Sequence, residues 1–279
     1  MRKITHTDLE EEVRKACIKA SLEGSPDLRP ALEDALFRES SELGKDAIQK
    51  LIDNLDIASK ERIPICQDTG FAMFFVERGE EVMVDGPGLS AAINKGMTDA
   101  YRDAYLRKAT CHCLTRKNRG DNSPAIIYEE TVPGDGLSVH FMAKGGGSEN
   151  MSAIGMLKPS QGRDGVVEFV AGVMDRAGAN PCPPVILGVG LGGTMEKAAL
   201  NSKKALLRPL MYANPDPELA AMETDILREV NRLGIGPQGY GGEVTALAVS
   251  MLRHPCHIAS LPVAVTVQCH ASRHAKFEL

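Results

Sequence analysis

The sequence has no tryptophan, and aromatic residues make up only 4% of its 279 residues. So few aromatic side chains argue against the stacking platforms on which single-stranded nucleic acids bind. Basic residues do not predominate either, because 32 Lys and Arg stand against 37 Asp and Glu, which gives a net charge of −5. A dedicated nucleic-acid-binding protein usually carries a basic excess, so the composition argues against that class of function.

The sequence also lacks a long apolar run. Its most apolar stretch, residues 183–193, is interrupted by glycines and is too short to span a membrane. The charged N-terminal residues do not resemble a secretory signal, so we expect a cytoplasmic protein that binds no membrane. The seven cysteines are odd in number. In a reducing compartment, metal ligation or chemistry explains such cysteines better than a disulfide framework does.

What remains is the composition of a globular protein, with 43% hydrophobic and 25% charged residues. We expect an α+β fold, with a helical N-terminal segment over residues 1–60 and a mixed α/β domain with antiparallel strand pairs over residues 61–279. Strands expected over residues 125–130 and 137–142 are joined by a Pro-Gly-Asp-Gly turn, which predicts that they form an antiparallel pair. A strand over residues 261–267 is expected to end the fold.

Residues 66–70, Cys-Gln-Asp-Thr-Gly, place a thiol, an amide, a carboxyl and a hydroxyl side by side in a loop before an expected strand. Such a loop is suited to supplying catalytic groups. The alternative is a structural turn, because Asp-Thr-Gly sequences commonly form hydrogen bonds with their own backbone.

Residues 144–150, Lys-Gly-Gly-Gly-Ser-Glu-Asn, form a second candidate segment. Three successive glycines allow several backbone N–H groups to converge on one anion, and Lys144 would add a positive charge. The alternative is a flexible turn that follows a strand.

Gly188, Gly190 and Gly193 satisfy the Gly-x-Gly-x-x-Gly pattern of dinucleotide-binding loops, and Asp216 lies near the expected acidic position. However, residues 209–217 contain three prolines and suit a central strand poorly. We therefore favour close backbone packing, and a helix N-terminus that helps to bind an anion, as the roles of this loop. A nucleotide-binding oxidoreductase remains the alternative from another functional class.

Cysteine and histidine recur toward the C-terminus, at Cys256, His257, Cys269 and His270. Taken alone, a histidine such as His257 is more often structural than catalytic. Residues 111–113, Cys-His-Cys, are typical of half a zinc site but have no matching second pair.

Five motifs in this order resemble the α subunit of the two-subunit iron–sulfur (class I) fumarate hydratases, and equally the N-terminal half of the single-chain enzymes. The α subunit of L-tartrate dehydratase shares the resemblance, which covers essentially the whole chain. The motifs are Cys-Gln-Asp-Thr-Gly at 66–70, Lys-Gly-Gly-Gly-Ser-Glu-Asn at 144–150, Asn-Pro-Cys-Pro-Pro with its glycine run from 180, Gly-Ile-Gly-Pro-Gln-Gly at 234–239, and Leu-Pro-Val-Ala-Val with Gln-Cys over 261–269.

The resemblance implies that Cys66, Cys182 and Cys269 hold a [4Fe–4S] cluster. Three protein ligands leave one iron with an open position, at which a substrate carboxylate and hydroxyl can bind and be polarised. The other four cysteines match no ligand position, and we interpret them as structural.

The same resemblance implies that Gln67, Asp68 and Thr69 lie beside the open iron. Gln67 is expected to contact the substrate, and Asp68 and Thr69 are expected to be catalytic. Asp68 is the expected participant in proton transfer, because hydration requires a proton to be exchanged at one carbon.

Further site residues follow from the resemblance. Arg107 matches an arginine that binds a substrate carboxylate, for which a guanidinium is well shaped. Gly145, Gly146 and Gly147 match a loop whose backbone N–H groups contact the substrate. His257 matches a catalytic histidine that, in single-chain relatives, reaches the site of the neighbouring protomer.

The resemblance covers only the N-terminal half of the single-chain enzymes, and their second half has no counterpart in it. It therefore implies a separate β subunit, an α2β2 assembly, and little or no activity for this chain alone. The expected reaction is reversible hydration of the dicarboxylate fumarate to L-malate. An α subunit of L-tartrate dehydratase is the alternative, although residues 148–150 and His257 match the fumarate hydratases better. A non-catalytic metal-binding subunit is a third possibility.

Overall fold

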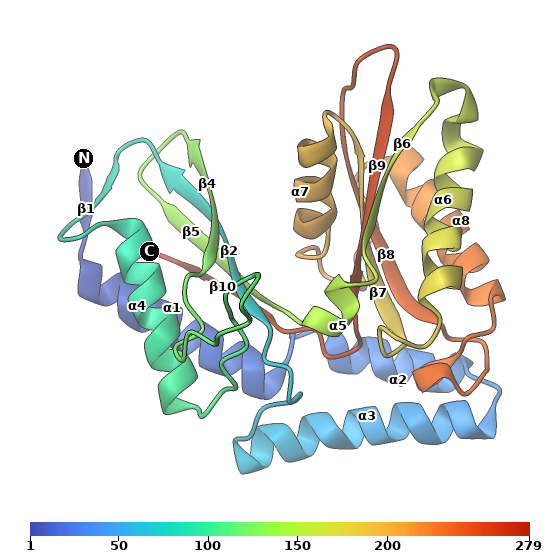
Figure 1. Cartoon of the computed structure of the whole chain (residues 1–279), viewed down its shortest axis with the longest axis horizontal. Coiled ribbons are helices and arrows are strands. Elements are labelled where there is room, and N and C mark those ends of the chain that lie inside the picture. The colour runs from blue at the N-terminus through green and yellow to red at the C-terminus, as the bar shows by residue number, and fades with distance from the viewer. The chain divides into compact units, whose positions relative to one another are not determined.

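The computed structural model describes all residues, Met1–Leu279, and the chain divides into two compact units. Unit 1 comprises Met1–Ser25, Leu55–Gly146 and Arg273–Leu279, and unit 2 comprises Pro26–Asn54 and Gly147–Ser272. This division does not follow the expected boundary after residue 60, because both units take part of the N-terminal helical segment. The expected α+β class is confirmed, since helices and sheets with antiparallel pairs occur in both units (Figure 1). No helix is both long enough and apolar enough to cross a membrane.

Unit 1 is built on a four-stranded sheet covered on one face by two helices (Figure 1). Phe74 and Phe141 of the sheet pack in one core with Val13 and Met97 of the helices. The elements of unit 1 are β1 (Arg2–Ile4), α1 (His6–Glu23), β2 (Phe71–Gly79), β3 (Val82–Val84), α4 (Leu89–Asp103), β4 (Ile126–Val132), β5 (Leu137–Lys144) and β10 (His274–Glu278).

The expected antiparallel pairing between residues 125–130 and 137–142 is wrong. The strand order is β10-β5-β2-β4, so β2 lies between β4 and β5 and is parallel to the first and antiparallel to the second. The turn that joins β4 to β5 therefore crosses the end of β2. Gly79 permits this crossing, because a Cβ there would collide with the carbonyl of Gly134. The N–H of Gly79 donates to the Gly136 carbonyl at 2.8 Å.

The fold also does not end with the strand expected over residues 261–267. That strand is followed by β10, which returns to unit 1 and pairs antiparallel with β5. The pairing places Arg273 beside β5, because the N–H of Ala143 donates to the Arg273 carbonyl at 2.9 Å.

Unit 2 contains a second four-stranded sheet, in which a central strand has one parallel and one antiparallel neighbour. Helix α3 continues from unit 2 into unit 1, and the short helix α5 begins at the last residue of unit 1. The elements are α2 (Leu28–Arg38), α3 (Glu42–Glu61), α5 (Gly146–Glu149), β6 (Ala153–Leu157), α6 (Gly162–Ala177), β7 (Val185–Gly192), α7 (Met195–Ala205), α8 (Pro217–Arg232), β8 (Ala246–His254) and β9 (Leu261–Gln268), with 3₁₀ turns at Pro159–Gln161 and Pro237–Gly239.

The strand order of this sheet is β6-β9-β7-β8, and helices cover both of its faces (Figure 1). Val185, Leu187 and Val189 of β7 pack in one core with α6 and α8. The alternate residues of β7 face α7, because side chains of a strand point to opposite faces in turn.

Glu39 fastens the end of α2 to the segment that enters β8. Its buried carboxylate accepts backbone N–H bonds from Ser40 at 3.0 Å, Ser41 at 2.9 Å and Val244 at 2.9 Å, and the single N–H of Glu243 is shared between its two oxygens. Burial by itself would raise the pKa of Glu39. The N–H donors stabilise the charged form more strongly, so the pKa is lowered from its ordinary value.

We expect Glu39→Gln to lower the free energy of unfolding by about 2 kcal/mol near neutral pH, because hydrogen bonds to a charged group are each worth about 1.5–3 kcal/mol. The folded-state pKa lies below the unfolded-state value, so this stability is fully present above an unfolded pKa of 4.5 and is lost as the pH falls through the folded value. Urea unfolding of parent and variant at several pH values measures the difference.

The matched control is Glu42→Gln, in which the exposed Glu42 loses its ion pair with Lys45 at 3.2 Å. That change should cost less than about 0.5 kcal/mol, as is usual at the surface. A difference between parent and Glu39→Gln that stayed constant below pH 4.5 would contradict the assigned role of the Glu39 carboxylate.

Candidate active site

The Asp68 carboxylate lies at an edge of the unit 1 sheet and is held there on both oxygens. Its Oδ1 accepts the N–H of Gly70 at 3.0 Å, and its Oδ2 accepts the N–H of Gly146 at 2.7 Å. The Gly70 contact is the structural turn that we considered above as the alternative interpretation of residues 66–70. The second joins two segments far apart in the chain, which meet because Phe71 at the start of β2 pairs with Lys144 at the end of β5.

Two buried side chains that sequence reasoning missed hold the backbone of this loop. The Arg273 guanidinium, which is 1% exposed, donates from Nη1 to the Asp68 carbonyl at 2.6 Å. The Tyr101 hydroxyl donates to the Thr69 carbonyl at 2.9 Å. Burial raises the pKa of Tyr101 well above its ordinary value, so the phenol stays protonated as a donor. Neither residue belongs to a motif, and only the fold brings them to Asp68.

Thr69 connects the Asp68 loop to Arg107. Its side chain is buried, and its hydroxyl donates to the Arg107 carbonyl. The side chains of Arg107 and Gln67 are exposed, and Cys66 Sγ donates to Gln67 Oε1 at 3.6 Å. The hydroxyl of Thr69 thus has a structural partner, and its catalytic role stays a prediction.

The glycine segment meets the Asp68 loop at Gly145 and Gly146. A Cβ at Gly145 would lie 3.2 Å from Asp68 Oδ2, so the two segments are in close contact. Lys144 is almost fully buried, and its ammonium donates to the Gly145 carbonyl at 3.3 Å. The N–H of Gly146 is committed to Asp68, while Gly147 belongs to unit 2 and is exposed. The predicted contacts of these glycines with a substrate therefore remain predictions.

Cys182 and Cys269 lie at one end of the unit 2 sheet. Cys182 precedes β7 and Cys269 follows β9, and because these strands are antiparallel, with Ile186 opposite Gln268, both cysteines are at the same sheet edge. The loops are joined further by His270, whose Nδ1 lies 3.0 Å from the Cys182 carbonyl.

The glycine-rich motif at residues 234–239 packs against this same edge. Gln238 donates from Nε2 to the Pro183 carbonyl at 2.6 Å, and the same nitrogen lies 3.2 Å from His270 Nδ1. The side chain of Gln238 thus connects the loops that carry Cys182 and Cys269. These contacts explain why the motif at residues 234–239, which has no obvious metal ligand, accompanies the two cysteines.

The three predicted cluster ligands are divided between the units, with Cys66 in unit 1 and the other two in unit 2. No disulfide involves any of the seven cysteines. The structure contains no group of three or more His, Cys, Asp and Glu side chains arranged to hold a single metal ion.

The four remaining cysteines belong to other segments of the chain. Cys17 is in the core of unit 1, where burial raises the pKa of its thiol well above the usual range. Cys111 and Cys113 lie in the loop between α4 and β4, and Cys256 donates to the Ser260 carbonyl at 3.2 Å in the connection between β8 and β9.

His257 lies at the opposite end of the unit 2 sheet from Cys269. It precedes β9 whereas Cys269 follows it, and an eight-residue strand spans about 26 Å. The side chain is exposed, and its Nδ1 accepts the N–H of Ala259 at 3.1 Å. Within unit 2, His257 therefore cannot act beside Cys182 and Cys269, so its predicted role requires another protomer.

The glycines of the dinucleotide-like pattern serve packing. Gly188 and Gly190 lie inside β7, whereas the fingerprint needs its first glycines in the turn that follows a strand. A Cβ at Gly190 would overlap the carbonyl of Ala198 in α7, so the glycine allows helix and strand to touch. Asp216 is the N-cap of α8 and accepts the N–H of Glu218 at 3.1 Å. The expected close backbone packing is confirmed, and the nucleotide-binding alternative has no structural support.

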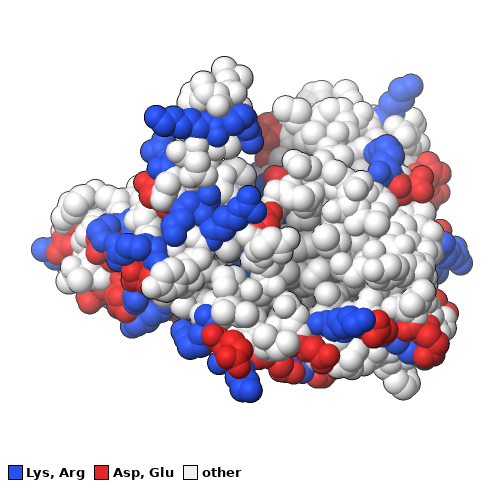
Figure 2. Space-filling view, turned by 60° about the horizontal axis from the view of Figure 1, so that its bottom comes forward, with Lys and Arg blue, Asp and Glu red and all other residues white.

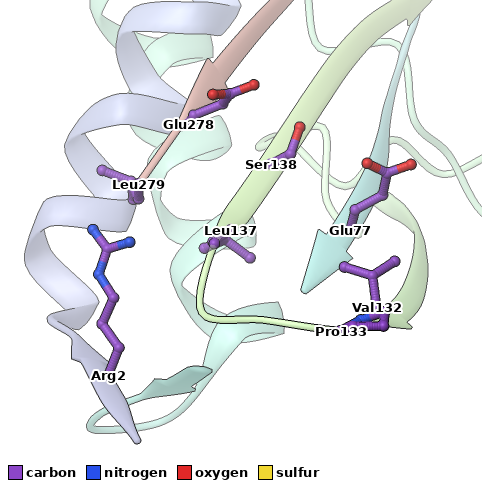
Figure 3. Close-up of a pocket in the computed structure, with 9 residues that line it drawn as sticks. Arg2, Glu77, Val132, Pro133, Leu137, Ser138, Glu278 and Leu279 are labelled. Carbon is purple, nitrogen blue, oxygen red and sulfur yellow. The ribbon is translucent and has the colours of Figure 1, made fainter. Parts of the chain in front are cut away.

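A cavity of about 450 Å³ in unit 1 lies far from the Asp68 loop. Figure 3 shows Glu77, Ser138 and Glu278 on three neighbouring strands at its wall, with Arg2 on the other side. Glu77 is near the far end of β2, about 23 Å along the strand from Gly70. The cavity contains none of the predicted catalytic, substrate-binding or metal-binding residues.

Comparison with known proteins supports the family resemblance that the sequence motifs indicate. Residues 10–278 match the model of a family described as fumarate hydratase (Fumerase). A Methanocaldococcus jannaschii protein provisionally named L(+)-tartrate dehydratase subunit alpha is 40% identical over 256 residues, which cover 89% of this chain and 90% of that protein. The L(+)-tartrate dehydratase subunit alpha of Escherichia coli strain UTI89 is 35% identical over 246 residues, which cover 87% and 80% of the two chains. This chain therefore belongs to the fumarate hydratase (Fumerase) family of hydro-lyases.

Proposed function

We propose that this chain is the cluster-binding α subunit of a hydro-lyase that reversibly hydrates fumarate to L-malate. The observation that carries the proposal is the meeting of three separately predicted segments in unit 1. Asp68 bonds to Gly146, and Thr69 of the same loop bonds to Arg107. A half-buried carboxylate and a glycine-rich backbone are thus assembled at one sheet edge, and the backbone of the exposed Arg107 is joined to them. These groups suit a dicarboxylate and a proton transfer.

The donor set fits a [4Fe–4S] cluster, because cysteine thiolates hold such clusters and two of the three predicted cysteines are close in sequence to residues of the site. Cys66 is two residues before Asp68, and Cys269 is four residues before Arg273, which binds the Asp68 loop. With Cys182, these residues would hold the cluster. When bound, a cluster with three protein ligands supplies an open iron that acts as a Lewis acid.

The protein residues account for the remaining requirements of the reaction. Arg107 binds one substrate carboxylate, and Gln67 contacts the substrate beside it. Asp68 exchanges the proton at the carbon that does not carry the hydroxyl. The two backbone N–H bonds to its carboxylate, at 3.0 and 2.7 Å, fix the orientation of Asp68 for this transfer.

L-tartrate is the second candidate substrate. The names of the relatives from M. jannaschii and E. coli favour it. Fumarate is favoured by the resemblance at residues 148–150 and at His257, which match the fumarate hydratases better than the tartrate dehydratases. Both substrates are four-carbon dicarboxylates, so Arg107 and Asp68 would serve either.

The relatives are named as alpha subunits, which supports a β subunit as the partner of this chain in an α2β2 enzyme. In that enzyme His257 would complete the site of a neighbouring protomer, since its own unit keeps it at the far end of the sheet from Cys269.

The test is to prepare this chain with its β subunit, reconstitute both anaerobically with iron and sulfide, and assay them with fumarate, L-malate and L-tartrate. We expect the highest kcat/KM with fumarate and L-malate, and no turnover by either subunit alone. Higher kcat/KM with L-tartrate would favour the second candidate. Full activity of the isolated chain would contradict the proposed division of the site between two subunits.

A further inference from the structure

The loop between α4 and β4 carries a strong local positive charge in an acidic chain. Residues 107–119, which we call the basic loop, contain five Arg and Lys residues and no Asp or Glu, although the net charge of the chain is −5. None of these cations forms an ion pair in the structure, in contrast to cations such as Arg14 and Arg228. The cations are Arg107, Lys108, Arg116, Lys117 and Arg119. Figure 2 shows Lys and Arg side chains gathered at the upper left of the view.

Both ends of the basic loop are attached to the Asp68 loop. At the first end, the Thr69 hydroxyl donates to the Arg107 carbonyl. Just beyond the second end, Asn122 donates from Nδ2 to the Gly70 carbonyl at 3.2 Å. The buried Asn122 also closes the neck of the loop, because its Oδ1 accepts the N–H of Ala109 at 2.7 Å. The backbone of the basic loop is therefore joined directly to the candidate site at Asp68.

Backbone hydrogen bonds hold the basic loop in an ordered, hairpin-like form. The N–H of His112 donates to the Lys117 carbonyl at 2.9 Å, and the N–H of Arg119 donates to the Thr110 carbonyl at 3.1 Å. Arg116, Lys117 and Arg119 remain exposed on this framework. Their charges are thus held at a defined place, and exposed charges attract a ligand over about 10 Å at 0.1 M salt.

We propose that the basic loop collects the dianionic dicarboxylate substrate electrostatically for the site at Asp68. This inference rests on the proposed function and deepens it. The acidic protein as a whole would repel a dianion, so a local positive field is what makes its approach favourable. Local fields of this kind raise the concentration and the association rate of a charged substrate by about 10- to 1,000-fold, and they weaken with salt.

The test neutralises three cations of the basic loop that lie outside the proposed substrate contacts, in the triple variant Arg116→Gln, Lys117→Gln and Arg119→Gln. The variant is studied in the reconstituted enzyme with its β subunit. At about 0.01 M salt we expect kcat/KM for the dicarboxylate substrate to fall about tenfold with kcat retained. The Kd of succinate, an unreactive dicarboxylate probe, should rise by the same factor. At about 1 M salt, where the Debye length is about 3 Å, parent and variant should agree.

The matched control removes the same amount of charge elsewhere, through Lys19→Gln, Lys158→Gln and Arg176→Gln, three exposed cations outside the basic loop. It should leave kcat/KM and the Kd of succinate at the parent values. If both triple variants changed kcat/KM and the Kd of succinate equally, net charge would be the cause, and the proposal would be overturned.

Two further outcomes would overturn it. The first is an active parent enzyme whose kcat/KM at low salt is unaffected by the loop variant. The second is a loop variant that no longer assembles with the β subunit in size-exclusion chromatography, since the loop would then be a protein-docking surface. An inactive parent enzyme would instead contradict the proposed function itself.

Discussion

Replacing Cys182 with serine should remove most of the iron from the reconstituted chain. We expect about four iron atoms and four sulfides in the parent, as a [4Fe–4S] cluster requires, and less than about one iron in the variant. Loss of a thiolate ligand leaves only two cysteines for the cluster, and a serine hydroxyl is not ionised at neutral pH. Iron and acid-labile sulfide are measured per chain after anaerobic reconstitution, and hydro-lyase activity with the β subunit should be lost in parallel. Cys66→Ser and Cys269→Ser should behave in the same way.

Cys256→Ser is the matched control, because Cys182 and Cys256 are both exposed cysteines of unit 2 and only the first is a predicted ligand. The control should retain the iron and sulfide content of the parent. Full iron content in Cys182→Ser would refute the assignment of Cys182 as a ligand. If the parent bound iron only together with the β subunit, the comparison would be repeated on the assembled enzyme.

Replacing Asp68 with asparagine should lower kcat by about 10²- to 10⁴-fold, which is the usual contribution of a positioned proton-transfer group. The substitution preserves size and shape but removes the ability to exchange a proton. It should leave the iron content unchanged, because Asp68 is not a predicted ligand. Steady-state kinetics of the reconstituted enzyme, with iron analysis of the same samples, measures both effects.

Asparagine also disturbs the local hydrogen bonds, because its NH₂ group cannot accept an N–H as the second carboxylate oxygen does. Thermal unfolding should therefore show a loss of about 1–3 kcal/mol, the cost of an unpaired buried donor. Asp85→Asn is the matched control, since Asp85 also accepts a backbone N–H in unit 1, from His6 at 2.7 Å, but lies outside the site. The control should lose stability and keep its kcat. A kcat that is equal in the Asp68 and Asp85 variants would exclude a proton-transfer role.

The helices and the main segments of the site could be predicted from sequence because their signals are local. The helical segment expected over residues 1–60 is present as α1, α2 and α3. Clusters of chemistry-bearing residues marked residues 66–70 and 144–150, and these segments contact one another through Asp68 and Gly146.

Strand pairing was not predictable in the same way. The turn at residues 133–136 suggested a hairpin, yet β2 lies between β4 and β5. A turn specifies only its own backbone geometry, whereas strand order depends on backbone hydrogen bonds between residues far apart in the chain. Gly79 was the available signal, because it makes room for the crossing loop.

The side chains that hold the Asp68 loop could not be predicted from local sequence either. The sequence by itself determined which thiols, carboxylates and glycines are available, since their identities and short-range spacing are local properties. Only the tertiary structure decided that Arg273 and Tyr101 hold the Asp68 loop and that His257 is remote from Cys182 and Cys269. The physical reason is that a buried hydrogen bond or a shared sheet edge depends on how distant segments pack, and no local pattern of residues encodes that packing.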